Sequence, residues 1–153
     1  MDIPLIEQAK IQARVLVPLV KALRQELGEE RANELVRKAL GDVYRKSGHD
    51  WSKRLGARST AQKMDVVWDK FAAGDALDYE VLKKTPDAYE LKVTGCRYAK
   101  FYQELGEPEL GFLLVCSQDV PVAEGFGTSL QLTQTIMRGA SYCDFRYRLK
   151  QEK

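Results

Sequence analysis

Hydrophobic residues recur at helical spacing through the beginning of the chain. Within residues 3–27, an apolar stripe is formed by Val15, Leu19, Leu23 and Leu27. Pro18 predicts a kink in this helix, and Gly28 predicts its end. Residues 29–46 repeat the periodicity, and the sequence KSGHDW is expected to end the second helix. The two helices are therefore predicted to form an antiparallel pair.

A third helix is predicted to begin at Ser59 and to stop at Gly74. Ser59 and Gln62 have the spacing of a capping box, in which each side chain accepts a hydrogen bond from the other residue's backbone N–H. One face of this helix is apolar, through Met64, Val67, Trp68 and Phe71. Residues 1–74 thus form a predicted helical half.

The pattern changes to the alternation typical of strands in the second half. Residues 78–96 predict a hairpin around a turn at 85–88, because apolar and polar side chains alternate along its second strand. Residues 129–149 predict another hairpin with a turn at 138–141. The last strand points four side chains to the core side: Cys143, Phe145, Tyr147 and Leu149.

Two helices are predicted between the hairpins, over residues 97–106 and from 108 to about 118. The second would carry Cys116 and Asp119 in its last turn. The expected fold class is α+β, with an N-terminal helical layer packed on an antiparallel sheet of about four strands and two inserted helices. A single domain over residues 1–153 is predicted, with 75–153 as the half that contains the sheet and the motifs.

Charge and cysteine content narrow the classes of function. The 24 Lys and Arg residues nearly balance the 22 Asp and Glu residues and are scattered, so no nucleic-acid surface is predicted. Asp2 stands where an export signal would be basic, and polar residues interrupt the apolar N-terminal stretch. A cytoplasmic protein without a membrane partner is therefore expected. The three cysteines are an odd number without CxxC spacing, which predicts reduced thiols rather than disulfides.

Cys116 and Asp119 are the first candidate site residues, because a spacing of three places them on one helix face. The alternative is a small buried cysteine followed by a solvated turn aspartate. A helix C-terminus and the Asp119 charge would both raise the pKa of the Cys116 thiol. Cys96 lies at or near the N-terminus of the helix predicted over residues 97–106, where backbone N–H groups and the helix dipole favour a thiolate. On electrostatics alone it is therefore a better nucleophile than Cys116. Cys143 is expected to fill the core or to line the site.

Other candidates would bind substrate rather than react with it. Arg97 and Arg138 are surface charges or partners for a substrate carboxylate, and Tyr98 is a further candidate for substrate binding. His49 is expected in an exposed loop between helices. A small molecule is the expected partner, and the helix over residues 6–27, which is apolar on more than one face, makes a homo-oligomer possible.

Residues 93–149 resemble the L-2-amino-thiazoline-4-carboxylic acid hydrolase family. The motifs that recur in order include Cys-x-x-Asp at 116–119, Glu-x-Phe at 124–126, Arg-Gly at 138–139 and Cys-Asp-Phe at 143–145. The segment GASYCDF is also similar to the end of 4-vinyl-reductase-type ligand-binding domains, in which a helical layer covers an antiparallel sheet.

The resemblance implies a hydrolase that opens a cyclic amidine or amide-like ring at a C–N or C–S bond. Cys116 and Asp119 would lie at the site, with Cys96 and Cys143 lining it. Either a thiolate or water is the nucleophile; water is favoured, with Asp119 as a base of ordinary pKa that is already ionised at neutral pH. No cofactor is expected, although a metal on the three cysteines stays open. The alternative is a non-catalytic ligand- or metal-binding module.

Overall fold

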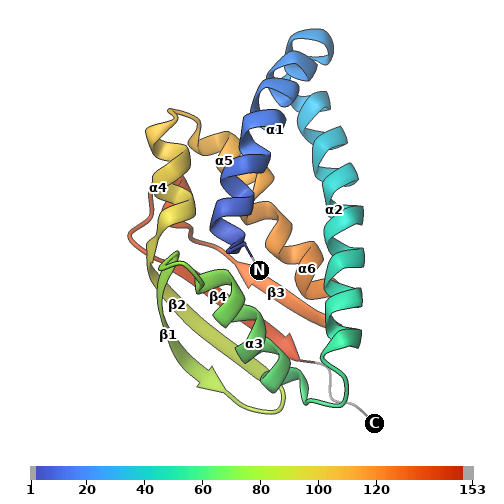
Figure 1. Cartoon of the computed structure of the whole chain (residues 1–153), viewed down its shortest axis with the longest axis vertical. Helices are drawn as coiled ribbons and strands as arrows, with labels where there is room; N and C mark the ends of the chain where they lie inside the picture. The colour runs from blue at the N-terminus through green and yellow to red at the C-terminus, as the bar shows by residue number, and fades with distance from the viewer. Residues whose placement is uncertain (1–2, 150–153) are drawn as a thin grey trace.

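A computed structural model of the chain describes residues 3–149, which form helices on one face of an antiparallel sheet (Figure 1). The helices are α1 (Leu5–Leu27), α2 (Glu29–Arg54), α3 (Thr60–Ala72), α4 (Arg97–Glu104), α5 (Pro108–Leu114) and α6 (Asp119–Gly125). The strands are β1 (Leu77–Lys84), β2 (Ala88–Cys96), β3 (Thr128–Leu132) and β4 (Cys143–Leu149). This arrangement confirms the predicted α+β class.

The sheet has the strand order β1-β2-β4-β3, and every neighbouring pair is antiparallel. The central pair β2 and β4 brings Leu91 opposite Phe145 and Val93 opposite Cys143. These side chains are buried against α3, where Trp68 joins the same hydrophobic cluster. The alternation in β2 and β4 therefore places alternate side chains in the core, as predicted, since apolar residues with a period of two give a sheet one buried face.

The capping box that begins α3 is present in both directions. Gln62 N donates to Ser59 Oγ at 3.3 Å, and Ser59 N donates to Gln62 Oε1 at 2.9 Å. The first helix runs as one element through Pro18 and ends before Gly28, whose φ of 83° lies in the region that glycine tolerates best. The predicted starts and stops of these helices are confirmed.

The second helix is longer than its sequence predicts, because α2 continues through KSGHDW to Arg54. Gly48 does not break it, since its lack of a side chain allows a close helix crossing instead. A Cβ atom on Gly48 would lie 2.4 Å from the Val122 carbonyl oxygen, and one on Gly125 would lie 2.2 Å from the Arg45 carbonyl oxygen. His49 is exposed as expected, but on this helix rather than in a loop.

The helix predicted from 108 to 118 is in fact two helices. α5 ends at Leu114, a 3₁₀ turn spans Cys116–Gln118, and α6 begins at Asp119. Pro121 explains the restart, because proline lacks an N–H and fits the first turn of a helix better than its interior. Asp119 therefore opens a helix instead of closing one.

The second hairpin also differs from its prediction. Its strands end at Leu132 and resume at Cys143, so the connection spans 133–142 and includes a 3₁₀ turn at Ile136–Arg138. Side chains hold this connection together with backbone hydrogen bonds such as that from Asp144 N to the Gln134 carbonyl at 3.3 Å. Cys143 Sγ accepts a hydrogen bond from Ile136 N at 3.3 Å, and the Asp144 carboxylate accepts others.

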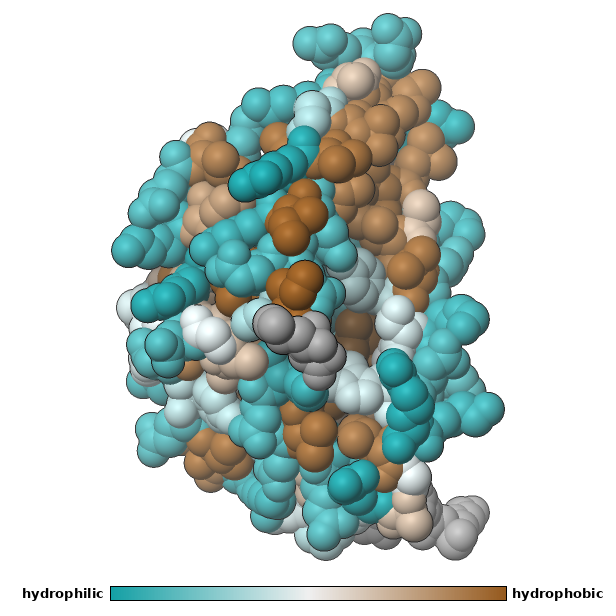
Figure 2. Space-filling model, viewed as in Figure 1, coloured by the Kyte–Doolittle hydropathy of each residue, from teal (hydrophilic) through white to brown (hydrophobic). Residues whose placement is uncertain are grey.

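An apolar stripe stays on the outside of α1, at Ile11, Val15 and Leu19, which are 54%, 66% and 52% exposed. Figure 2 shows apolar surface gathered over the upper part of α1 and α2. A contact with a second copy of the chain through this stripe stays a prediction. Within residues 3–149, no helix combines the length and the apolar character needed to cross a membrane.

Candidate functional site

A cavity of about 200 Å³ lies where the helical layer meets the sheet. Its walls combine members of two hydrophobic clusters, one among α1, α4 and α5 and one between α3 and the sheet. Most lining side chains are apolar or aromatic. The polar lining consists of Gln8, Gln12, Tyr44, Cys96, Tyr98, Tyr102, Cys116, Gln118, Asp119, Thr135 and Cys143.

Five of the predicted site residues meet in this cavity, namely Cys96, Tyr98, Cys116, Asp119 and Cys143. They come from separate elements. Cys96 ends β2, Tyr98 lies in the first turn of α4, Cys116 opens the 3₁₀ turn, Asp119 opens α6 and Cys143 begins β4. Residues far apart in the sequence thus line one cavity, which brings these five residues together without assigning roles to them.

The two predicted arginines do not line the cavity. Arg97 is exposed at the start of α4. Arg138 stacks on the Phe112 ring, with its guanidinium carbon 3.4 Å from the ring centroid, and pairs with Glu109 at 3.7 Å. His49 is likewise absent from the lining. A ligand inside the cavity therefore meets none of the three basic side chains that the sequence offered.

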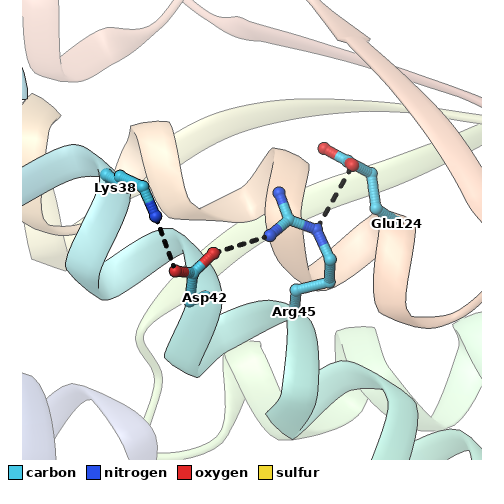
Figure 3. Close-up of polar contacts among 4 residues, drawn as sticks. All are labelled: Lys38, Asp42, Arg45 and Glu124. Atoms are coloured by element: carbon cyan, nitrogen blue, oxygen red, sulfur yellow. Dashed lines mark hydrogen bonds and ion pairs between the residues drawn. The ribbon is translucent and has the colours of Figure 1, made fainter.

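The position of α6 is set by its packing against α2. The glycine crossing brings the two backbones together, and a polar chain on the surface links the same helices (Figure 3). Arg45 contacts Asp42 at 3.3 Å and Glu124 at 3.4 Å, while Lys38 contacts Asp42 at 3.3 Å. Exposed ion pairs contribute little, so the buried helix crossing is the main constraint on Asp119.

Asp119 is the electrostatic centre of the cavity. Burial raises the pKa of its carboxyl to about 8, because no cation or hydrogen bond from residues 3–149 offsets the loss of hydration. Its charge adds to the effect of burial in raising the pKa values of neighbours on several elements: Tyr44, Cys96, Tyr98, Cys116, Cys143 and Tyr147. At pH 7 the carboxyl is therefore mostly protonated.

None of the three thiols is poised as a thiolate at neutral pH. Burial raises the pKa of Cys116 well above its usual range, and the Asp119 charge raises it further, while Arg138 opposes the rise only weakly. Burial raises the pKa of Cys143 to about 11. Cys96 caps α4 and accepts a hydrogen bond from Ala99 N at 3.4 Å.

The electrostatic advantage predicted for Cys96 is partly present. Burial raises the pKa of its thiol, and hydrogen bonds from the Ala99 and Tyr98 backbone N–H groups lower it only in part. The net shift is upward because burial outweighs these hydrogen bonds, so the Cys96 thiol is un-ionised at neutral pH. Desolvation raises the pKa of Cys96 by more than the N-terminus of α4 lowers it. The reason is that the end of β2, which supplies this cap, is also covered by the helical layer. That Cys96 is a better nucleophile than Cys116 stays a prediction.

Gln118 and Tyr44 belong to the lining but escaped the sequence analysis. Gln118 is 2% exposed; its Nε2 donates to the Leu113 carbonyl at 3.1 Å, whereas its Oε1 has no partner among the described residues. The one available signal was its place between Cys116 and Asp119 in the Cys-x-x-Asp motif. Tyr44 sits on α2 and carried no comparable signal, because its contact with the cavity depends on the α2 packing.

Asp144 is a second buried carboxyl that sequence analysis did not single out. It accepts hydrogen bonds from Thr133 N at 2.8 Å, from Gln134 N at 2.7 Å and from the Thr133 hydroxyl. Burial acts to raise its pKa, but these hydrogen bonds together lower it. Asp144 thereby fixes the connection that delivers Thr135 to the cavity wall.

Metal binding by the cysteines receives no support from the geometry. Over residues 3–149, no group of three or more His, Cys, Asp and Glu side chains is placed to hold a metal ion. A zinc site on three thiolates would need them close together and deprotonated. The raised pKa values of these thiols, of which Cys143 is buried and Cys96 and Cys116 are half-buried, disfavour the deprotonation.

These features define an α+β protein with a partly open, mainly apolar cavity between helices and sheet. Residues 8–147 match the family of L-2-amino-thiazoline-4-carboxylic acid hydrolases, so the chain belongs to that family. The match contains every residue of the cavity wall except Leu5. The resemblance seen over residues 93–149 therefore extends through most of the helical half.

No curated protein matches the chain. Among solved structures, the chain is similar to the Fe(II) unliganded H-NOX protein from K. algicida, with a TM-score of 0.46, 10% identity, and coverage of 90% of this chain and 72% of that one. A point mutant of the same H-NOX protein gives a TM-score of 0.46 and 10% identity, with coverage of 92% and 74%. Neither supports a functional assignment.

Proposed function

We propose that this chain hydrolyses a small cyclic amidine or isothiourea ring in the cavity, with Asp119 as the proton-transfer group and water as the nucleophile. One observation carries the proposal: a single carboxyl, with a raised pKa, lines a partly open and mainly apolar cavity. Membership in a family named for 2-amino-thiazoline-4-carboxylate hydrolysis supports the reaction class. Strongly shifted carboxyl groups in cavities are frequent at catalytic sites.

The size of the cavity suits one small ring. An apolar cavity of about 150 Å³ accommodates benzene, and this one measures about 200 Å³. A five-membered ring with an exocyclic nitrogen fits this space together with a water molecule. A larger, drug-sized ligand does not.

The chemistry can be written with balanced atoms. The ionised Asp119 takes a proton from water as the water oxygen adds to the ring carbon between sulfur and nitrogen. The carboxyl then returns this proton to the ring nitrogen of the tetrahedral adduct. As the C=O bond forms, the ring C–N bond breaks and the hydroxyl proton of the adduct passes to the departing nitrogen. The product is an open-chain thiocarbamate-type compound with a free amine. Such proton transfers contribute about 10²- to 10⁴-fold to rates.

Water is favoured over a thiol as the nucleophile because the thiols are held un-ionised. Each cysteine in the cavity has a raised pKa, and for Cys116 burial and the Asp119 charge act in the same direction. A thiol attack would therefore have to begin from a very small thiolate fraction. The thiols instead supply polarisable, weakly polar walls around the ring.

The proposal is tested by turnover of a panel of aminothiazolines, cyclic isothioureas and hydantoins. Asp119→Asn is expected to lower kcat/KM by at least about 100-fold, because general acid–base catalysis is lost. Asp42→Asn, an exposed carboxylate on α2, is the matched control and should keep full activity. Cys116→Ala should stay within about tenfold of the wild type if water is the nucleophile. Full activity in Asp119→Asn would sink the assignment.

The raised pKa of Asp119 changes the pH dependence expected from sequence, which assumed a base that is already ionised at neutral pH. A base with a pKa of about 8 is not yet fully ionised at pH 7, so kcat/KM should rise about tenfold per pH unit and level off near pH 8. A cysteine nucleophile would also give a rising profile. It would differ by losing activity in Cys116→Ala or Cys96→Ala, and by inactivation with iodoacetamide that substrate prevents.

A non-catalytic ligand-binding module is the second candidate, and the un-ionised thiols and aromatic walls of the cavity favour it. The same panel separates the two. Ring compounds that bind and are recovered unchanged after long incubation would establish the module, whereas ring-opened product establishes the hydrolase.

A further inference from the structure

We infer that the cavity selects a cationic cyclic amidine or isothiourea that carries no carboxylate group. This inference deepens the proposed function, on which it rests, by naming the class of ring that the site accepts. It separates the ligand of this chain from the carboxylated ring that gives the family its name.

The charge of the cavity wall is one-sided. Asp119 is the lining residue that carries a formal charge, and none of the described lining residues is Lys, Arg or His. Arg138, the basic residue whose charge reaches the thiol of Cys116, is occupied outside by the Phe112 ring and Glu109. A ligand carboxylate inside this space would lack any cationic partner.

Burial makes this asymmetry decisive. An unpaired carboxylate loses its hydration on entering a mainly apolar cavity, and here its charge would also oppose the ionisation of Asp119. A protonated amidine has the opposite balance. It loses hydration as well, but it gains a charge-assisted pair with the carboxylate, and its planar N–H groups match the two carboxylate oxygens.

A second acceptor points in the same direction. Gln118 is 2% exposed, lines the cavity, and keeps its Oε1 without a partner among the described residues. An amidinium has more N–H donors than one carboxylate can satisfy, so Gln118 supplies the further acceptor that such a ligand needs. The aromatic walls from Trp68, Phe71 and Phe145 suit the ring carbons and sulfur.

Binding of a cation should be coupled to the release of one proton from the protein. The titratable groups whose interaction with Asp119 is seen are Tyr44 from α2, Cys96 from β2, Tyr98 from α4, Cys116 from the 3₁₀ turn, and Cys143 and Tyr147 from β4. All are raised in pKa and stay neutral at pH 7, so Asp119 is the group that changes. A bound cation would ionise it and release its proton.

The test is calorimetric titration of the full chain with 2-amino-2-thiazoline, with its 4-carboxylate, and with a neutral 2-alkyl-2-thiazoline. The uncarboxylated amidine is expected to bind at least about tenfold more tightly than either other probe, the factor that a modest difference in buried charge pairing supplies. Titrations at pH 7 in buffers of different ionisation enthalpy should show release of nearly one proton per amidinium.

Variants locate the effect. Asp119→Asn should abolish both the preference for the cation and the proton release, while Asp42→Asn should change neither. Gln118→Leu should weaken the amidine several-fold and leave binding of the neutral ring unchanged. Equal or tighter binding of the carboxylated ring would overturn the inference, and so would failure of every amidine to bind at millimolar concentration.

The outcomes for ligand class and for catalysis can be told apart. An amidine that binds selectively but is recovered unchanged would leave the ligand class standing and remove the hydrolase proposal. Turnover of the carboxylated ring with a kcat/KM equal to that of the uncarboxylated ring would support the hydrolase proposal and overturn the inferred ligand class.

Discussion

The regions around Asp119 and Asp144 place the same side chain in opposite situations. Asp144 is 7% exposed and accepts three hydrogen bonds from Thr133 and Gln134, which lower its pKa despite burial. Asp119 faces the cavity, where burial alone raises its pKa to about 8. The two carboxyls also lie in the two Asp-containing motifs of the family resemblance.

The difference separates a structural carboxylate from one available to a ligand. Asp144 uses its acceptor capacity within the protein and holds the connection between β3 and β4. Asp119 accepts no such hydrogen bonds from the described residues, and its loss of hydration raises its pKa. Burial by itself does not distinguish the two roles, whereas the presence or absence of donors does.

The largest effect on stability is expected for Asp119→Asn. The unfolded chain ionises Asp119 near pH 4, while the folded chain keeps it protonated up to about pH 8. The folded state thus holds more protons in this range, so the residue lowers stability as pH rises, by about 1.4 kcal/mol per unit. The variant should be more stable than the wild type at pH 8 by up to about 5 kcal/mol.

Urea unfolding at pH 5 and pH 8 checks this expectation. The advantage of Asp119→Asn should be small at pH 5 and large at pH 8, which distinguishes it from a pH-independent packing effect. A constant difference between variant and wild type at the two pH values would show that the carboxyl is not held neutral by the fold.

Asp144→Ala should have the opposite sign and a smaller magnitude. It leaves the backbone N–H groups of Thr133 and Gln134 without their acceptor, at a cost of about 2 to 3 kcal/mol. Asp144→Asn keeps one carbonyl acceptor and should cost about half as much. Thermal unfolding at pH 7 measures both, and equal stability of Asp144→Ala and the wild type would contradict the structural role.

The pH dependence of Asp144 sharpens the contrast. Its folded pKa is lowered, so its contribution is present above the ordinary carboxyl pKa and disappears as pH falls through the lowered value. The difference between the wild type and Asp144→Asn should therefore narrow only in acid, whereas the effect of Asp119→Asn grows toward alkaline pH.

The smallest effect is expected for Glu124→Gln, the exposed carboxylate that joins α6 to α2. Its partner Arg45 lies 3.4 Å away, and both side chains are 46% exposed. Solvent-exposed pairs contribute between about 0 and 1 kcal/mol, and salt screens them. Unfolding with and without about 0.5 M NaCl should show little change; a loss above about 2 kcal/mol would mean that the surface chain, rather than the glycine crossing, fixes α6.

Local patterns determined much of the fold. The alternation in β2 and β4 predicted one buried face, Ser59 and Gln62 predicted the start of α3, and Gly28 predicted the end of α1. These features succeed because their causes lie within a few residues of one another: side-chain period, capping geometry and backbone freedom at glycine. The family was likewise indicated by short motifs within residues 93–149.

Other features were decided by contacts between distant segments. Gly48 reads as a helix end, yet it lies inside α2 because Val122 packs against its backbone. The Asp144 hydrogen bonds replace the tight turn predicted at 138–141. In both cases a contact beyond the nearest residues outweighed the local preference. The start of α6 at Asp119 instead has a local cause in Pro121.

The chemistry of the candidate site was decided mainly by contacts between distant segments. The sequence by itself determined which residues carry reactive groups, and Cys96, Cys116, Asp119 and Cys143 were all nameable from it. Only the tertiary structure decided that they line one cavity, that Arg97 and Arg138 do not, and that Asp119 has a pKa of about 8. The reason is physical: a pKa depends on the solvent, charges and donors within a few ångströms, and those neighbours come from elements that are distant along the chain.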